Sequence, residues 1–83
     1  MKLNREEFET LWNIGNSWQT DPVRASDGTP DSVKKYMKIF LKLDEIGLIK
    51  IEIRDGQIYG AHETKEGEEV MDQKVYDSWI PEC

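Results

Sequence analysis

The chain has 83 residues, 34% of them charged and 37% hydrophobic, with a formal net charge of −6. This length predicts a single domain, residues 1–83, with a modest core. No apolar run approaches the roughly 20 residues of a membrane helix, and the first residues lack a secretion signal. The lone cysteine, Cys83, cannot form an internal disulfide. We therefore expect a cytoplasmic protein with no membrane association.

The charge is unevenly distributed along the chain. Residues 1–23 sum to −2, residues 24–55 to +1 and residues 56–83 to −5. An acidic total disfavours loose binding of polyanions, because neutralisation of phosphates dominates that affinity. The mildly basic middle still allows a local basic face.

The first predicted helix covers Asn4 to Trp18. Asn4 can cap it, and Glu7 stands three residues later, as in a capping box. Apolar residues at helical spacing predict its core face: Phe8, Leu11, Trp12, Gly15 and Trp18. Gly15 has two interpretations, either a close crossing by another helix or simple tolerance of glycine.

A break and a second helix follow. Pro22 to Ser26 can form one short helical turn, and Asp27-Gly28 is typical of a turn. Thr29 can cap a long helix that starts at Pro30 and ends before Gly47. Its predicted core residues are Val33, Tyr36, Met37, Phe40, Leu41 and Leu43.

A tight hairpin is predicted next, with Asp55-Gly56 between the strands Leu48 to Arg54 and Gln57 to Glu63. A two-residue loop gives the pairs Arg54–Gln57, Ile53–Ile58, Glu52–Tyr59, Ile51–Gly60 and Ile49–His62. Alternation then predicts a buried face of Ile49, Ile51, Ile53 and Ile58. The wetter face has Lys50, Glu52, Arg54 and Tyr59. His62 is expected at the edge of the core.

The C-terminal third predicts a last helix that Thr64 caps and Pro81 ends. Its expected apolar face contains Val70, Met71, Val75, Trp79 and Ile80. An acidic run accompanies it: Glu63, Glu66, Glu68, Glu69 and Asp72. This run is interpreted either as a solvated helix face or as a surface that binds protein or mimics DNA.

Three short motifs resemble winged helix-turn-helix proteins. The segment 43–49, Leu-Asp-Glu-Ile-Gly-Leu-Ile, resembles the L-E-E-x-G-L-I of MarR- and PadR-type regulators. Arg54-Asp55-Gly56 resembles their wing tip, and Tyr59 followed by Thr64-x-x-Gly67 resembles their exit from the wing. Small phage and prophage winged-helix proteins are similar in size. The resemblance implies an α+β winged helix-turn-helix fold with a degenerate second helix.

The resemblance also implies where DNA would bind. Helical spacing places Lys34, Lys35, Lys38 and Lys42 on an arc opposite the apolar stripe. In a winged helix they would contact phosphates, and Arg54 would enter a minor groove; otherwise they form a solvated face. The sequence shows no metal-ligand set, nucleophile–base pair or phosphate-binding glycine loop, so neither an enzyme nor a cofactor is expected.

Two functions remain open from the sequence. The first is a winged-helix protein that binds duplex DNA as a homodimer in transcription or phage regulation. The alternative is a protein-interaction module, such as a phage-encoded inhibitor of a host protein, that uses its acidic C-terminal third. A lysine face clear of acids favours the first, and burial of that face by the C-terminal helix favours the second.

Overall fold

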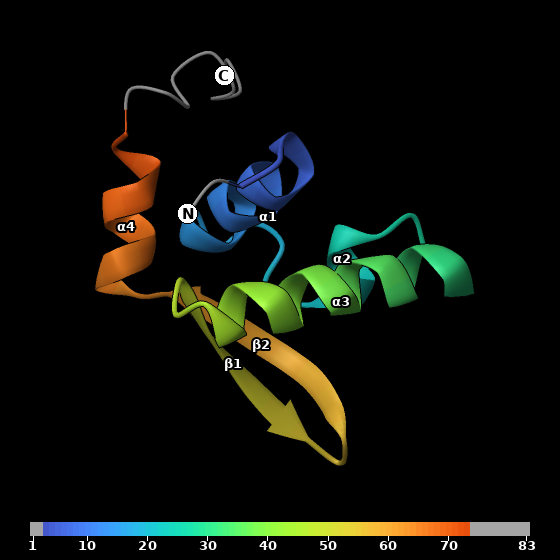
Figure 1. Ribbon diagram of the computed structural model, residues 1–83. Coiled ribbons are helices and arrows are strands. Elements are labelled where there is room, and N and C mark those ends of the chain that lie inside the picture. Colours follow the sequence, from blue (N-terminus) through green and yellow to red (C-terminus); the bar gives the residue numbers. More distant parts are fainter. Residues whose placement is uncertain (1–2, 74–83) are drawn as a thin grey trace.

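The computed structural model describes residues 3–73, which form an α+β domain. Three helices precede a two-stranded antiparallel hairpin and a fourth helix (Figure 1). The elements are α1 Arg5–Gly15, α2 Pro22–Ala25, α3 Pro30–Glu45, β1 Ile49–Arg54, β2 Gln57–Glu63 and α4 Lys65–Met71. Within this range, no helix is long and apolar enough to cross a membrane. The hairpin projects from the helices, and α4 stands beside its base, with α1 at the same end of the domain.

The predicted helix starts are confirmed. The Asn4 side chain accepts a hydrogen bond from the Glu7 amide at 2.8 Å, and the Glu7 carboxylate accepts one from the Asn4 amide at 3.0 Å. Asp21 and Thr29 cap α2 and α3, each followed by proline in the first turn. These caps satisfy amides that have no partner within the helix. The short helical turn predicted at Pro22 is therefore a real, four-residue helix.

Helix α1 ends earlier than predicted, and this changes the position of Trp18. Ser17 has a positive φ of 59°, and the Trp18 and Ser17 amides donate to the carbonyls of Asn13 and Ile14. This is a Schellman ending with serine at the left-handed position that glycine usually occupies. The turn directs Trp18 outward, where it is 56% exposed. Its predicted place in the core is wrong.

The core lies where α1, α3 and the base of the hairpin meet. Its buried side chains are Leu3, Phe8, Leu11, Ile14, Ile39, Phe40, Leu43, Leu48, Ile49 and Ala61. Leu41, predicted to be in the core, is 46% exposed, and Ile39 is buried instead. The two residues lie on opposite flanks of Phe40 on the helix surface. The side that faces α1 and the hairpin base is therefore the side that Ile39 occupies.

The hairpin turn is confirmed, but most of the predicted register is wrong. Asp55 and Gly56 have positive φ angles of 53° and 77°, and Arg54–Gln57 and Ile53–Ile58 pair as expected. A β-bulge then inserts Tyr59 as an extra residue. The remaining pairs are Glu52–Gly60, Ile51–Ala61, Lys50–His62 and Ile49–Glu63. A bulge re-aims every later side chain of its strand.

The bulge decides which side chains of β2 enter the core. Ala61 is buried, and His62 is exposed, where its ring lies 4.0 Å from the Glu52 carboxylate. The core-edge position predicted for His62 is therefore wrong. The regular register would have turned Gly60 and the polar His62 inward, and burial of an unpaired polar ring costs free energy.

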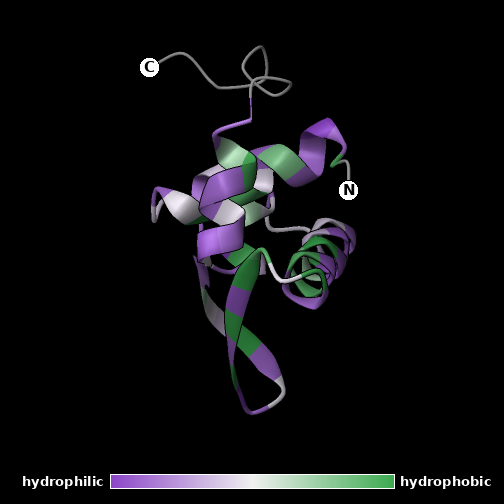
Figure 2. Ribbon diagram, turned by 60° about the vertical axis from the view of Figure 1, so that its left-hand side comes forward, coloured by the Kyte–Doolittle hydropathy of each residue, from purple (hydrophilic) through white to green (hydrophobic). Residues whose placement is uncertain are grey.

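The predicted buried face of isoleucines is covered only at the hairpin base. Ile49 is buried, Ile51 and Ile58 are half-buried, and Ile53 near the tip is 57% exposed. The hairpin shows hydrophobic and hydrophilic bands along its length beyond the helices (Figure 2). The sequence pattern identified the apolar face correctly, but the helices are too few to cover all of it.

Thr64 joins α4 to the connection between α3 and β1. Its amide donates to the Leu48 carbonyl at 3.0 Å, and its hydroxyl donates to the Gly47 carbonyl at 2.6 Å. The same hydroxyl accepts from the Gly67 amide at 3.2 Å and so caps α4, as predicted. Gly47 itself ends α3 with a φ of 86°. Helix α4 ends at Met71, with Asp72 as its C-cap, so the predicted end of the helix near Pro81 is wrong. The predicted helix residues Val75, Trp79, Ile80 and Pro81 lie outside the described residues.

The Asp-Gly turn makes a testable prediction. Gly56→Val should lower the free energy of unfolding by about 1–3 kcal/mol, because a β-branched residue resists a positive φ. Urea unfolding would measure it, with Gln57→Val as the control, since residue 57 is exposed and already in strand conformation. If the two variants unfolded at the same urea concentration, the turn would not require glycine at position 56.

Candidate nucleic-acid interface

The four lysines of α3 differ in their surroundings. Lys34 and Lys38 are exposed and have no ion pair with any residue of segment 3–73. Lys35 and Lys42 are half-exposed, and each reaches a carboxylate on α1. Helix geometry places Lys35 and Lys42 together on one flank of the arc. The structure thus divides the predicted lysine face into an open pair and an ion-paired pair.

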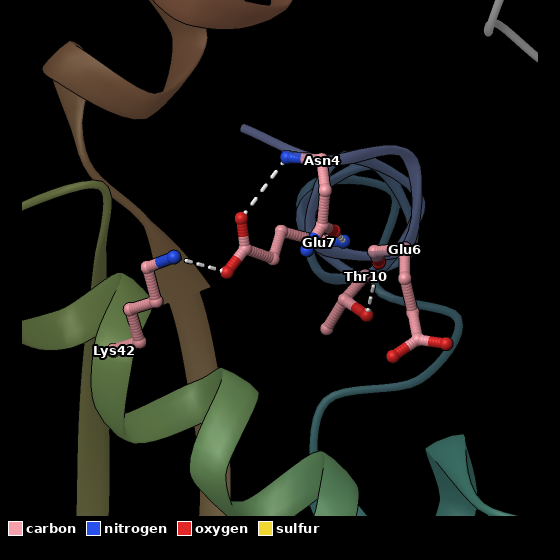
Figure 3. Close-up of polar contacts among 5 residues, drawn as sticks. All are labelled: Asn4, Glu6, Glu7, Thr10 and Lys42. Atoms are coloured by element: carbon pink, nitrogen blue, oxygen red, sulfur yellow. Dashed lines mark hydrogen bonds and ion pairs between the residues drawn. The ribbon is translucent and has the colours of Figure 1, made fainter. Parts of the chain in front are cut away.

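The ion pair of Lys42 with Glu7 is more buried than that of Lys35 with Glu6. The Lys42 ammonium donates to Glu7 Oε2, and the other oxygen of this carboxylate accepts from the Asn4 amide (Figure 3). Burial raises the pKa of Glu7, but hydrogen bonds from Lys42 and Asn4, with the Lys42 charge, outweigh it and leave the pKa below its ordinary value. Removal of Lys42 would leave a buried carboxylate without its counter-charge, so this lysine has a structural role.

The Lys35 pair is a surface contact. Its ammonium lies 2.6 Å from Glu6 Oε2, and both side chains are about half exposed. Hydrogen bonding to Glu6 raises the pKa of Lys35. Exposed pairs of this kind contribute little to stability, so Lys35 can exchange its carboxylate partner for another anion at small cost.

The lysine face is therefore neither clear of acids nor covered by α4. Glu6 and Glu7 reach it from α1, and Asp31 and Glu45 are exposed on α3 itself. Helix α4 packs chiefly against α1 and β2, at the opposite end of the domain from the start of α3 (Figure 1). Among residues 3–73, α4 thus leaves the solvent side of α3 open.

Arg54, at the last position of β1, stacks on the bulged tyrosine. Its guanidinium carbon lies 4.9 Å from the centre of the Tyr59 ring, a cation–π distance. A hydrogen bond with Glu52, and the charge of that carboxylate, raise the pKa of Tyr59. Tyr59 is exposed, as predicted for the wetter face. The stack holds Arg54 near the hairpin tip; the sequence placed both residues on one face but did not predict the bulge.

An apolar groove lies between α2, α3 and the hairpin tip, and sequence reasoning did not identify it. Its cavity of about 130 Å³ is lined by Pro22, Val23, Val33, Met37, Gln57 and Ile58. Val23 is 61% exposed. The groove depends on how far the hairpin stands from α3, a distance that no local pattern specifies.

Comparisons with known proteins do not assign a function to this chain. No family model matches the chain, and neither curated proteins nor solved structures give a match. Across residues 3–73, no group of three or more metal-ligating side chains is arranged to hold an ion. The arrangement of α3 and the hairpin therefore supplies the evidence about function.

Proposed function

We propose that this chain is a small winged-helix domain that binds duplex DNA through α3 and the hairpin, with the hairpin as the wing. The observation that carries the proposal is the open pair Lys34 and Lys38 on a capped, 16-residue helix beside a hairpin with Arg54 near its tip. A major groove admits an α-helix, and lysines on its exposed side contact phosphates.

The order of elements and the motif chemistry support the proposed fold family. Gly47 and Thr64 have physical roles that fit their positions in the winged-helix motifs: Gly47 ends α3, and Thr64 joins α4 to the start of the hairpin. The second helix is short but present. A role in transcription or phage regulation belongs to this proposal.

The proposed affinity is modest and strongly dependent on salt. Lys34, Lys38 and Arg54 supply few phosphate contacts per copy, and Lys35 adds one where it releases Glu6. The net charge of −6 opposes the approach of DNA. A homodimer would double the contacts, so we propose that two copies bind together.

Exchange of the open lysines tests the proposal. The double variant Lys34→Glu/Lys38→Glu should weaken binding to all duplexes by at least tenfold at about 50 mM salt, because it removes two phosphate contacts and adds repulsion. The neutral double variant with glutamine should reduce the log–log salt slope by about 0.9 per lost contact. Fluorescence anisotropy with labelled duplexes measures both quantities.

The control is a single lysine-to-glutamate exchange away from the proposed interface, which makes half the charge change of the double variant. Lys65→Glu lies at the start of α4 and should leave the affinity nearly unchanged. Absence of binding by the wild type at high micromolar protein would contradict the proposal, because non-specific affinity alone reaches about 10⁻⁴ to 10⁻⁶ M for a true DNA-binding protein.

The apolar groove favours a second candidate, a protein-interaction module. Val23 beside the groove and Ile53 at the hairpin tip are large apolar side chains left exposed. In that case a partner would be captured from nuclease-treated lysate, Met37→Glu in the groove would abolish capture, and the lysine variants would be silent. Charge reversal at Glu66, Glu68 and Glu69 would test the acidic face of α4 in the same assay.

A further inference from the structure

Glu63, the last residue of β2, has an unusual setting. Its Oε2 atom is buried and makes no hydrogen bond within the part of the chain that the structure describes. The carboxylate lies against Gly15 at the end of α1, so that a Cβ built on Gly15 would lie 2.5 Å from Oε2. The close approach suggested for Gly15 therefore comes from a carboxylate rather than from another helix.

The charges around Glu63 have its own sign. Glu68 and Asp72, in and just after α4, line a cavity of about 390 Å³ together with Glu63 and Met71. The structure places no cation of residues 3–73 within ion-pair distance of Glu63. The Glu63 carboxylate lies at the C-terminal end of α1, which carries partial negative charge. The residue paired with Glu63 on β1 is the apolar Ile49. Glu63 also directly precedes Thr64, the N-cap of α4, and the N-terminal dipole of this short helix favours the ionised form. The end of α1, the apolar Ile49 and the charges of Glu68 and Asp72 oppose it.

We infer that this junction is a proton-operated latch, in which protonation of Glu63 strengthens the docking of α4 onto α1 and the hairpin, and ionisation loosens it. The inference concerns α4 and is independent of the proposed DNA binding by α3. Because the neutral carboxyl removes the repulsion from Glu68 and Asp72 while keeping the shape of the side chain, the latch needs no rearrangement.

The direction of the pH dependence follows from the pKa of Glu63. Burial raises it above the ordinary 4.5, and Glu68 and Asp72 raise it further. A raised folded-state pKa means that ionised Glu63 costs stability at neutral pH, and this cost disappears as the pH falls toward 4.5. Glu7 and Asp27 have lowered pKa values, so the stability they contribute is lost only as the pH falls below their ordinary values of 4.5 and 3.8. Mild acidification should therefore stabilise the domain.

Glu63→Gln tests the latch in the full chain. The wild type should melt at a higher temperature at pH 5 than at pH 7, and the variant should show the higher Tm already at pH 7. Glu69→Gln, an exposed change on α4, should keep the wild-type difference. Comparison of these proteins at constant ionic strength cancels the titrations that they share.

A local measurement separates the latch from a general gain in stability. At one pH, amide hydrogen exchange in α4 should be slower in Glu63→Gln than in the wild type, with little change in α3. Two results would overturn the inference. The first is a Tm of Glu63→Gln at pH 7 equal to that of the wild type, and the second is a difference in Tm between pH 7 and pH 5 that is as large in the variant as in the wild type. If millimolar Ca²⁺ or Mg²⁺ raises the wild-type Tm as much as acid does, and Glu63→Gln abolishes this effect, the pocket is a cation site and the proton latch is wrong.

Discussion

Phe40→Ala is expected to lower the free energy of unfolding by about 3–5 kcal/mol, the range for a buried phenylalanine. Phe40 is 0% exposed and belongs to the core cluster that also holds Phe8, Leu11 and Leu43. The cost combines the lost burial of the ring with the cavity that rigid neighbours cannot close. A domain of this length has a total stability of roughly 4–12 kcal/mol, so this loss removes about a quarter of it at the upper end of the range and all of it at the lower end.

The neighbouring residue provides the control. Leu41→Ala removes a similar apolar group from the exposed side of α3, and its cost should stay below about 1 kcal/mol. Thermal and urea unfolding, followed by far-UV circular dichroism, measure both variants. Equal losses at positions 40 and 41 would mean that α3 is rotated from the orientation in this structure.

Gly67→Ala is expected to cost about 3 kcal/mol or more, at the upper end for overpacking. A Cβ at this position would lie 2.2 Å from the Leu48 carbonyl oxygen and 3.2 Å from its carbon. The backbone of Leu48 cannot easily shift, because two hydrogen bonds hold it. The Leu48 carbonyl accepts from the Thr64 amide, and the Leu48 amide donates to the Leu43 carbonyl. The gain of about 1 kcal/mol from alanine over glycine in a helix does not offset the overlap.

Gly60→Ala is the matched control, since among residues 3–73 its Cβ would meet only the Glu52 carboxylate, at an ordinary 3.8 Å. It should change stability by less than about 1 kcal/mol. The two variants can be compared by differential scanning calorimetry at one pH. If Gly67→Ala were as stable as Gly60→Ala, the close contact between α4 and the start of β1 would be wrong.

The expected costs at Phe40 and Gly67 bear on how the proposed interface is supported. Phe40 fixes α3 to the core, and Gly67 lets α4 approach the hairpin base closely enough for the Thr64 hydrogen bonds. Both residues therefore support the proposed interface indirectly, by fixing the positions of α3 and the hairpin. Variants at these positions should reduce DNA binding only through unfolding, whereas Lys34 and Lys38 variants should remain folded.

The element boundaries could be read from the sequence because local chemistry determines them. Asn4, Thr29 and Thr64 satisfy helix amides three residues away, Gly47 takes a left-handed φ at no steric cost, and Asp55-Gly56 sets the turn. These interactions span a few residues, so a pattern of residue types is sufficient. Two helix ends are exceptions. Serine does not mark a left-handed position as glycine does, so Ser17 was missed, and α4 ends at Met71 where the sequence predicted a helix that continues to Pro81.

The tertiary structure decided everything that depends on contacts between distant segments. The Tyr59 bulge, burial of Ile39 in place of Leu41, and exposure of the hairpin tip follow from where α1 and α3 meet the hairpin. Of the candidate site, the sequence identified the lysines and Arg54, but it could not show that Glu6 and Glu7 engage Lys35 and Lys42, some 29 and 35 residues away in the chain. Helical periodicity gives the direction of a side chain and not its neighbour. The ion pairs, the Gly67 contact and the setting of Glu63 therefore required the packed domain.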